Sequence, residues 1–458
     1  MKFYMVSLGC HKNLVDAETI IKDFEKSGHE LTNDESNADA VIIMTCAFIG
    51  PAKEEARSVI SEFTAKKKRY GFKVFVGGCY AKRYSESVAS EFPAVDGWFG
   101  IGGFEGIAER LEKAENGSMI STAIIPSAYE TYSGRRLTTP PHRAWLKISD
   151  GCSHKCAYCA IPMIRGNNYR SRTIEDILKE ANELAEKGVR ECGIIAQDTG
   201  LYGIDLEKRH MLVTLLEELE KIKGPEWIRL LYINPFSMPK DLLSYMKSSA
   251  KTVPYLDIPM QHASQSVLRR MKRPGCGSEY LDLIAKIREE LPDAAIRSTF
   301  IVGFPGETDE EFEELEDFIE KAKINRAGFF EYSDEEGTAA YGYDGKVSEI
   351  VKRRRSARIM RLQQKISADI TSRLKGKTIE VMAESPFARN KMRDFVMQFG
   401  NRSLGTGNAW LGRTKWDAPE VDALALIELP EGYIPSAGEI MHMEVTHTGL
   451  YDIAGKKK

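Results

Sequence analysis

Two successive alternations of strand-like and helix-like segments dominate this chain of 458 residues. In the first, apolar runs at 2–8, 38–44 and 73–78 are typical of buried strands, and helical patterns lie between them and after Tyr80. Alternation at this spacing predicts a parallel sheet covered by helices on both faces. We therefore expect an N-terminal parallel α/β domain over residues 1–125.

The second alternation covers residues 138–372 and contains six strand candidates. They lie at 144–149, 191–196, 228–233, 254–258, 295–302 and 326–332. The last helical segment between them, 308–322, is amphipathic. Six strand–helix units are too few for a complete eight-fold barrel, so we expect a partial (β/α)6 barrel. In such parallel architectures the site lies at the carboxyl ends of the strands.

The pattern changes toward the end of the chain. Residues 346–375 are helical and basic, and we interpret the run 352–358 as a solvated helix face rather than a nucleic-acid site. Residues 373–455 hold short strand-like runs separated by Gly and Pro, which predict a small antiparallel β-barrel. Lys456–Lys458 are expected to form a frayed tail. The Ser/Thr/Pro-rich segment 121–143 is expected to join the first two domains.

Six of the eight cysteines fall into two groups of three. Cys10, Cys46 and Cys79 each follow one of the apolar runs of the first domain. Because the carboxyl ends of parallel strands lie along one edge of a sheet, we expect these three residues to meet there. A single cysteine is more often an ordinary buried residue, but three at equivalent strand ends favour a shared ligand set.

The second group, Cys152, Cys156 and Cys159, lies in the run GCSHKCAYC directly after the first barrel strand. A 4Fe–4S cluster usually takes four thiolates, so three leave one iron open to bind a substrate. The alternative is a zinc site that includes His154 or His142. Zinc sites prefer paired cysteines with a second pair elsewhere in the chain, which favours the cluster.

Overall composition bears on the binding partners and the cellular compartment of the chain. A net charge of −3 and a pI near 6.3 give no general attraction to nucleic acid. No run approaches the ~18 apolar residues of a membrane helix, and we interpret the start of the chain as a mature N-terminus without a membrane anchor. Grouped cysteines in a reducing compartment are more often metal ligands than disulfides, so we expect a cytoplasmic protein.

At Cys152–Cys159 the chain resembles the radical S-adenosylmethionine (SAM) superfamily, whose hallmark is C-x3-C-x-aromatic-C on a partial β/α barrel. The resemblance implies a 4Fe–4S cluster whose open iron binds SAM, and a radical that removes hydrogen from an unactivated C–H bond. The order of the three domains resembles the methylthiotransferases over essentially the whole chain, with the last module similar to a TRAM domain. In that family Cys10, Cys46 and Cys79 are expected to hold a second 4Fe–4S cluster, SAM is both methyl donor and radical source, and the product carries C–S–CH3.

The methylthiotransferases have two branches that differ in substrate. The RimO branch modifies the β-carbon of an aspartate in small-subunit ribosomal protein S-twelve, and the MiaB branch modifies adenosine in tRNA. The stretches SLGCHKNLVDAE, AQDTGLYGIDL, IPMQHAS and FFEYSDEEGTAA resemble the RimO branch. His11 and Ala17 depart from the Pro and Ser usual there, without removing a cluster ligand. We expect RimO-type methylthiolation; a tRNA methylthiotransferase and a non-catalytic iron–sulfur or zinc protein are the alternatives.

The residues expected to contact SAM belong to the cysteine loop or to the strand ends of the barrel. They are Tyr158, Gln197, Asp198, Thr299, Gly303 and Gly306. For the two glycines, ordinary turn chemistry is an equal alternative. Gln261 and His262 are candidates for the substrate path. We interpret Cys192, in a strand candidate, and Cys276, in a turn, as non-ligands.

Charge in the terminal barrel bears on the partner. Residues 377–455 contain seven Lys or Arg and eleven Asp or Glu. RNA binding depends largely on neutralising phosphates, so nucleic acid is not expected as substrate, and the acidic run 416–422 favours a basic protein partner. Trp410 and Trp416 are expected in core or protein-contact roles. The resemblance further implies a reductant, such as flavodoxin or ferredoxin, and a sulfur donor.

Overall fold

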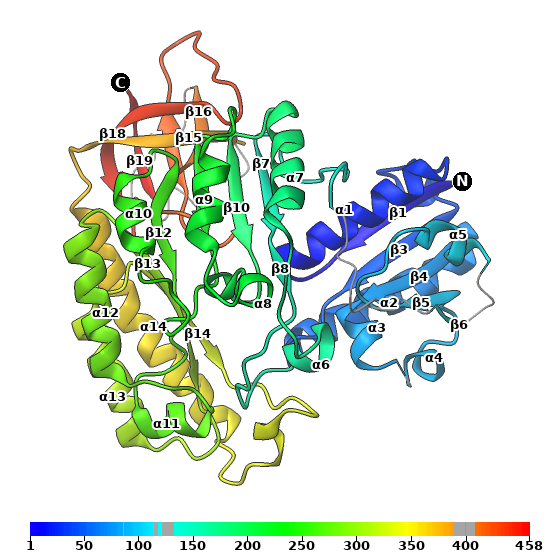
Figure 1. Cartoon of the computed structure of the whole chain (residues 1–458), viewed down its shortest axis with the longest axis horizontal. Helices are drawn as coiled ribbons and strands as arrows, with labels where there is room; N and C mark the ends of the chain where they lie inside the picture. Colours follow the sequence, from blue (N-terminus) through cyan, green and yellow to red (C-terminus); the bar gives the residue numbers. More distant parts are fainter. Residues whose placement is uncertain (86, 114–117, 121–131, 389–398, 400–407) are drawn as a thin grey trace.

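The computed structural model describes residues 1–85, 87–113, 118–120, 132–388, 399 and 408–458. It contains an N-terminal α/β domain, a central domain of parallel strands and helices, and a C-terminal barrel (Figure 1). This is the predicted fold class. The predicted end of the first domain at residue 125 lies outside the described residues. Within the described residues, no helix is long and apolar enough to cross a membrane.

The N-terminal domain is built on a six-stranded parallel sheet in the order β2-β1-β3-β4-β5-β6. Its strands are β1 (Lys2–Ser7), β2 (Glu30–Leu31), β3 (Ala40–Thr45), β4 (Lys73–Gly78), β5 (Gly97–Phe99) and β6 (Ser118–Ile120). Its helices are α1 (His11–Lys26), α2 (Gly50–Tyr70), α3 (Cys79–Arg83), α4 (Val88–Glu91) and α5 (Ile107–Glu112). The three long strands were predicted; the short β2, β5 and β6 have no apolar run of their own.

Both faces of this sheet are covered. Val41 and Ile43 pack with α2 and α3 on one face, and Ile42 and Met44 pack with α1 and α5 on the other. Because neighbouring strand residues point to opposite faces, burial on both sides requires a continuous apolar run. This arrangement aligns the carboxyl ends of β1, β3 and β4 along one edge.

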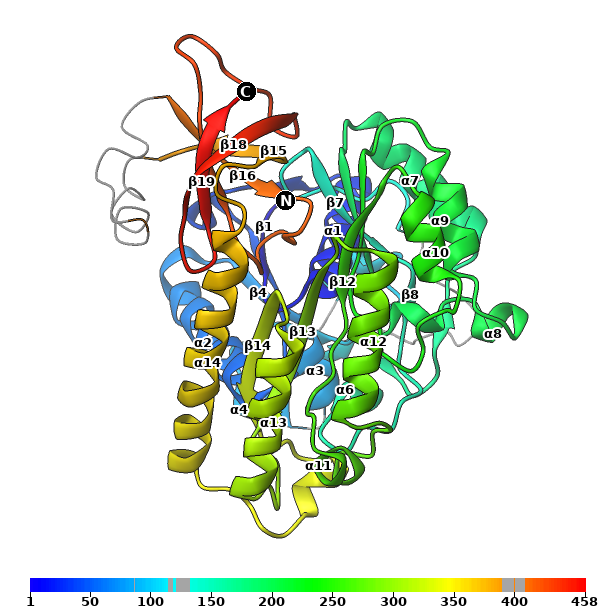
Figure 2. The same cartoon turned by 90° about the vertical axis from the view of Figure 1, so that its left-hand side faces the viewer.

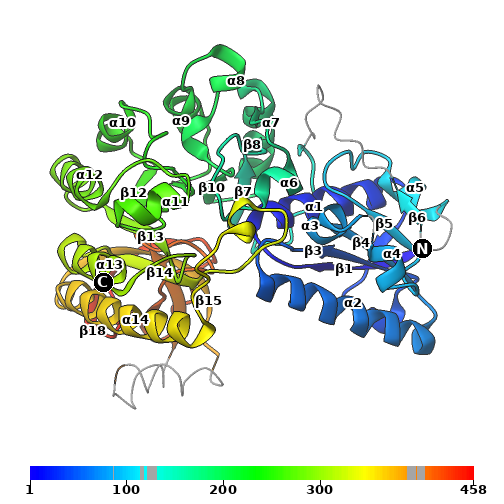
Figure 3. The same cartoon turned by 90° about the horizontal axis from the view of Figure 1, so that it is seen from below.

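The central domain is a six-stranded parallel sheet in the order β14-β13-β12-β11-β10-β7, so each strand lies beside its neighbour along the chain. The strands are β7 (Arg143–Lys147), β10 (Glu191–Ile195), β11 (Trp227–Leu230), β12 (Thr252–Asp257), β13 (Ala295–Val302) and β14 (Arg326–Glu331). The longer helices are α7 (Ile174–Glu186), α9 (Leu212–Glu220), α10 (Leu242–Ser248), α12 (Gly277–Glu290), α13 (Asp309–Ala322) and α14 (Glu349–Ser372). They follow the outside of the strand arc (Figure 3). The predicted partial barrel is confirmed.

The basic run 352–358 on α14 is only partly solvated. Lys352 and Arg355 are buried. The Nζ atom of Lys352 donates to the carbonyl of Tyr332, and Arg355 pairs with the buried carboxylate of Glu307. The prediction of a fully solvated face is therefore wrong for these two residues, because α14 covers the last strands of the partial barrel.

The C-terminal domain is a closed barrel in the order β15-β16-β17-β19-β18. Its strands are β15 (Thr378–Pro386), β16 (Ala409–Thr414), β17 (Ala425–Glu428), β18 (Ile440–Thr448) and β19 (Ile453–Lys457). All pairs are antiparallel except β17 with β19. The prediction of a frayed tail is wrong, since Lys456 lies in β19 opposite Glu444.

This barrel covers the amino-terminal ends of the central strands (Figure 2). Two acids of the run 416–422 pair with arginines of the central domain. Asp417 lies 2.7 Å from Arg326, and Glu420 lies 3.0 Å from Arg143. Trp410 is buried in the core of the small barrel, as expected. These acids of the run therefore form ion pairs inside the chain, between the C-terminal barrel and the central domain. The expectation of a basic partner for the barrel rests on its remaining acids.

Candidate functional site

Cys10, Cys46 and Cys79 lie at one edge of the N-terminal sheet. Cys10 is the N-cap of α1, Cys46 follows β3 directly, and Cys79 is the first residue of α3. A Cβ added to Gly9 would lie 3.0 Å from the Sγ of Cys46, so the chain at Cys10 passes against Cys46. Gly9 and Gly78 both have φ +90°, a conformation that favours glycine. The geometry is the predicted one, and the role of the thiols as ligands stays a prediction.

Charges distinguish Cys10 from its two companions. Burial raises the pKa of the Cys46 thiol, and it raises the pKa of Cys79 to about 12. Burial opposes ionisation of Cys10 too, but Lys12 and Arg165 together hold the pKa of its thiol below the ordinary value. Because the thiolate is the metal-binding form, these cations favour a ligand role at this edge.

The loop Cys152–Cys159 follows the end of β7 and is anchored at both of its ends. The amide of Cys152 donates to the carbonyl of Gly166 at 3.1 Å, and the amide of Ala157 donates to the carbonyl of Met271 at 2.8 Å. These two hydrogen bonds hold the backbone on either side of Cys156.

Arg273 is the cation of this second group. Its Nη1 atom donates to the Sγ of Cys156 at 3.7 Å. Burial raises the pKa of Cys152 to about 11 and that of Cys159 to about 12. Arg273 therefore supplies positive charge where buried thiolates are otherwise disfavoured. Tyr158 is half-buried beside these groups.

Two predicted SAM contacts, Gln197 and Asp198, follow β10. The buried carboxylate of Asp198 accepts from the Ser237 hydroxyl at 2.7 Å and lies 2.7 Å from the Nε2 atom of His154. Asp198 thus holds the cysteine loop. Gln197 donates through Nε2 to Asp150 at 3.0 Å, while its Oε1 atom is buried without a hydrogen-bond partner. That free acceptor fits a ligand with N–H donors, such as the SAM amino group.

Thr299, Gly303 and Gly306 lie on or just after β13. Thr299 is half-buried and its carbonyl accepts from the amide of Gln261. Gly303 and Gly306 both have φ +75°, and the amide of Gly303 donates to Glu307 at 2.8 Å. For these two glycines the turn alternative is visible in the structure. SAM contact by the three residues stays a prediction.

Three other residues considered in the sequence are His262, Cys192 and Cys276. His262 is fully buried, its Nδ1 atom accepts from the amide of Ser264, and burial lowers its pKa to about 3. It does not line an exposed path. Cys192 belongs to the core of the central domain, and Cys276 is the N-cap of α12.

A buried ionic network that was not predicted links the two cysteine groups. Arg165 lies in the short helix α6 (Ile161–Arg165), six residues after Cys159. Its guanidinium donates to Asp16 of α1 and to Asp150, each at 3.0 Å, and approaches the Sγ of Cys79 at 4.0 Å. The Arg-Gly pair after the loop and the VD pair after Cys10 are its only sequence signals.

Lys147 completes this network from the central domain. Its Nζ atom lies 2.8 Å from Asp16 and 2.8 Å from Asp150. All four charged side chains are mostly or fully buried. Two cations against two carboxylates balance the charge, which burial requires.

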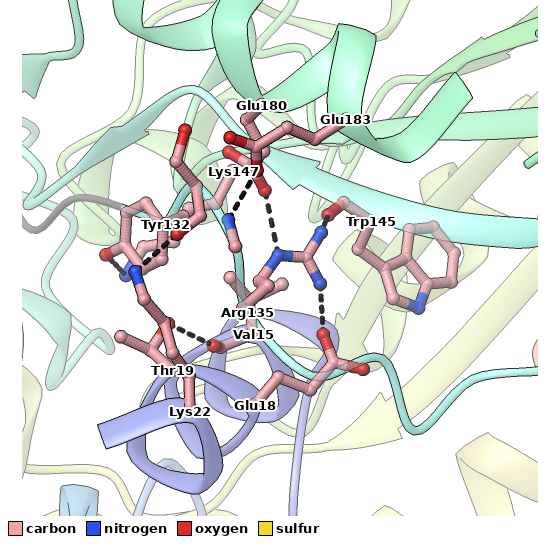
Figure 4. A network of polar contacts seen from close by, with 12 residues as sticks. Val15, Glu18, Thr19, Lys22, Tyr132, Arg135, Trp145, Lys147, Glu180 and Glu183 are labelled. Carbon is pink, nitrogen blue, oxygen red and sulfur yellow. Dashed lines mark hydrogen bonds and ion pairs between the residues drawn. The ribbon is translucent and has the colours of Figure 1, made fainter. Parts of the chain in front are cut away.

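Two further contacts dock the N-terminal domain on the partial barrel. Arg135 bridges Glu18 of α1 and Glu180 of α7 and donates to the carbonyl of Trp145 (Figure 4). On the other side, Glu335 after β14 pairs with Lys53 at 2.8 Å and Arg83 at 2.6 Å. The N-terminal domain thus contacts both edges of the open barrel, β7 and β14.

The structure also bears on the zinc alternative. Over the described ranges, no three His, Cys, Asp or Glu side chains gather tightly enough to bind one metal ion. Ligands of a 4Fe–4S cluster bind different irons and need not converge on one point. His154 and His142, the histidines of the zinc alternative, are engaged with Asp198 and Glu384.

Three family models match the chain. The radical SAM superfamily matches residues 146–319, an uncharacterized protein family (UPF0004) matches 2–100, and the TRAM domain matches 403–457. A curated relative from Pelotomaculum thermopropionicum, named ribosomal protein uS12 methylthiotransferase RimO, is 42% identical over 100% of this chain and 99% of its own length. The chain belongs to the RimO family of radical SAM methylthiotransferases.

Other similarities agree with this assignment. A RimO from Clostridioides difficile is 39% identical over 99% of this chain and 98% of its own length. Among solved structures, the radical SAM methyltransferase TsrM from Kitasatospora setae has a TM-score of 0.54 at 12% identity and covers 84% of this chain and 79% of that one. Such low identity shows the fold alone. As a RimO-family member, the chain is a radical SAM methylthiotransferase with an iron–sulfur cluster and SAM as cofactors.

Proposed function

We propose that this enzyme replaces a hydrogen on the β-carbon of an aspartate in ribosomal protein uS12 by a methylthio group. The names of its relatives support the substrate. The observation that carries the two-site chemistry is the buried Arg165 network, which joins both cysteine groups in one junction. The reaction takes place in the cytoplasm, where a reductant such as flavodoxin or ferredoxin and a sulfur donor are supplied by other molecules.

Two 4Fe–4S clusters are part of the proposal. One is held by Cys152, Cys156 and Cys159, and an auxiliary one is held by Cys10, Cys46 and Cys79. When bound, the clusters and SAM supply the electron, the radical, the methyl group and a site for sulfur. The protein supplies position, charge and exclusion of water.

Individual residues of this chain provide the positioning and the charge. Arg273 donates to the sulfur of Cys156, and Asp198 orients the loop through His154. The Oε1 atom of Gln197, which is buried without a hydrogen-bond partner, would accept a hydrogen bond from SAM. Lys12 and Arg165 favour the Cys10 thiolate in the auxiliary group.

The test is a mass measurement on both candidate substrates. Reconstituted enzyme is incubated with SAM, reductant and sulfide, and offered ribosomal protein uS12 or tRNA in separate reactions. The proposal predicts that an aspartate peptide of uS12 gains the mass of SCH3 in place of H. The same gain in digested nucleosides alone would instead identify a tRNA methylthiotransferase, and no gain in either substrate would leave the proposed reaction without support.

A further inference from the structure

Lys12 is a buried cation at the junction of the two cysteine groups. It lies two residues after Cys10, and its side chain crosses from the N-terminal domain into the partial barrel. Its Nζ atom is 3.2 Å from the carbonyl of Ala196, which follows β10, and 3.7 Å from the centre of the Tyr232 ring, which follows β11. Ala196 is next to Gln197, whose amide donates to Asp150, two residues before Cys152.

The charge of Lys12 has no carboxylate partner, unlike that of most buried cations. Among the described residues, buried lysines and arginines within 4.0 Å of a carboxylate are Lys147, Lys352, Arg135, Arg165, Arg172, Arg229, Arg355 and Arg413. The two exceptions are Arg273, which donates to Cys156, and Lys12. Both exceptions lie beside a cysteine group.

Burying an ammonium group costs free energy unless anions nearby compensate its charge. Lys12 has three N–H donors, of which one meets the Ala196 carbonyl and the ring of Tyr232 takes another. The Cys10 thiolate offsets part of the charge, and the remaining N–H donor can meet a second anion.

Strained backbone on the barrel side marks the same place. Tyr232 has φ +62° although it is not glycine, and its amide is held by Asp257 at 3.1 Å. Such outliers persist where the surroundings fix them and are frequent at ligand sites. The ring of this same residue lies against the Lys12 ammonium.

We propose that Lys12 binds the side-chain carboxylate of the substrate aspartate. This inference rests on the proposed function, in which the modified carbon is the β-carbon, one bond from that carboxylate. Binding the carboxylate beside Cys10 holds the reacting carbon at the edge where sulfur is delivered and facing the strand ends of the barrel. Lys12 therefore selects an aspartate over its neutral amide, asparagine.

The test measures binding apart from turnover. Reconstituted enzyme with SAM and no reductant is titrated with a fluorescent uS12 peptide that carries the target aspartate, or with the same peptide carrying asparagine. Hydrogen bonds to charged groups contribute about 1.5–3 kcal/mol, so wild-type enzyme should bind the aspartate peptide about 10- to 140-fold more tightly. Lys12→Met should abolish this preference, whereas Lys26→Met, an exposed position on the same helix, should keep it.

The outcomes separate this inference from the proposed function. If wild-type enzyme modifies uS12 and Lys12→Met keeps the full preference for aspartate, the role of Lys12 is wrong while the function stands. If wild-type enzyme modifies neither uS12 nor the peptide, the function itself fails. Circular dichroism and peptide-independent SAM cleavage check that Lys12→Met is folded. Should that variant not fold, equal binding of the two peptides by wild-type enzyme is enough to overturn the inference.

Discussion

The guanidinium of Arg165 approaches the thiol of Cys79 at 4.0 Å, although the two residues belong to different domains and lie 86 positions apart. Arg165 ends the helix that follows Cys159, so the loop with one cysteine group carries a cation to the other. Asp16 and Asp150 fix the guanidinium in place at 3.0 Å each. The two groups are therefore one structural unit.

Replacing Arg165 should disturb both halves of this unit. Among the described residues, Arg165→Gln leaves Lys147 as the one cation within 4.0 Å of Asp16 and Asp150. Breaking a buried pair costs about 3–5 kcal/mol. We expect a lower thermal midpoint and, because a nearby positive charge is lost, a lower reduction potential for the cluster proposed at Cys79. Redox titration followed by EPR measures the second effect. An unchanged potential in a folded variant would show that Arg165 is structural only.

Glu335 should control docking of the N-terminal domain on the β14 edge. Its side chain is 2% exposed and pairs with Lys53 and Arg83. Glu335→Gln leaves two cations unpaired, so we expect a clear loss of stability and faster limited proteolysis between the domains. The neighbouring Glu336 is exposed, and Glu336→Gln is the matched control. Equal effects of the two substitutions would disprove the docking role.

Asp417 should perform the same task for the C-terminal barrel. It pairs with Arg326 at 2.7 Å and accepts from the Thr414 hydroxyl at 2.6 Å. Asp417→Asn should destabilise the protein by about 3 kcal/mol, as expected for a broken buried pair. The exposed Glu431 offers a control in Glu431→Gln, which should change the thermal midpoint little. A stable Asp417→Asn variant would mean that apolar contacts alone hold the barrel.

Glu307 gives a pH-dependent prediction. Burial raises its pKa to about 7, against the attraction of Arg355. A carboxyl with a raised folded pKa contributes stability below its unfolded pKa, and this contribution is lost as the pH rises through 7. From pH 6 to pH 8 the loss amounts to about 1 kcal/mol. Glu307→Gln should flatten this slope in thermal midpoints. A slope equal to that of wild type would assign it to other groups.

Local sequence patterns predict much of this architecture. The long strands, the partial barrel and the strand-end position of all six cysteines follow from apolar runs and their spacing. The short strands β2, β5 and β6 and the strands β16 and β19 were missed. The run IAGKK of β19, for example, is not apolar and is ordered by pairing with β18. Tertiary context overrides local preference there.

The charged junction could not be predicted in the same way. Asp16, Lys147 and Arg165 are far apart in sequence, and each alone resembles an ordinary surface charge. Their burial depends on how α1, β7 and α6 pack together. For the same reason the acids of 416–422 suggested an exposed surface, while the structure places Asp417 against Arg326.

Iron analysis of single-cysteine variants tests the central claim, two separate clusters, most directly. After anaerobic reconstitution, wild-type enzyme should hold about eight irons per chain, and Cys46→Ala and Cys156→Ala about four each. Cys156→Ala should abolish SAM cleavage, whereas Cys46→Ala should abolish sulfur insertion and retain some cleavage. About four irons in the wild-type enzyme, or loss of one and the same cluster in both variants, would contradict the account.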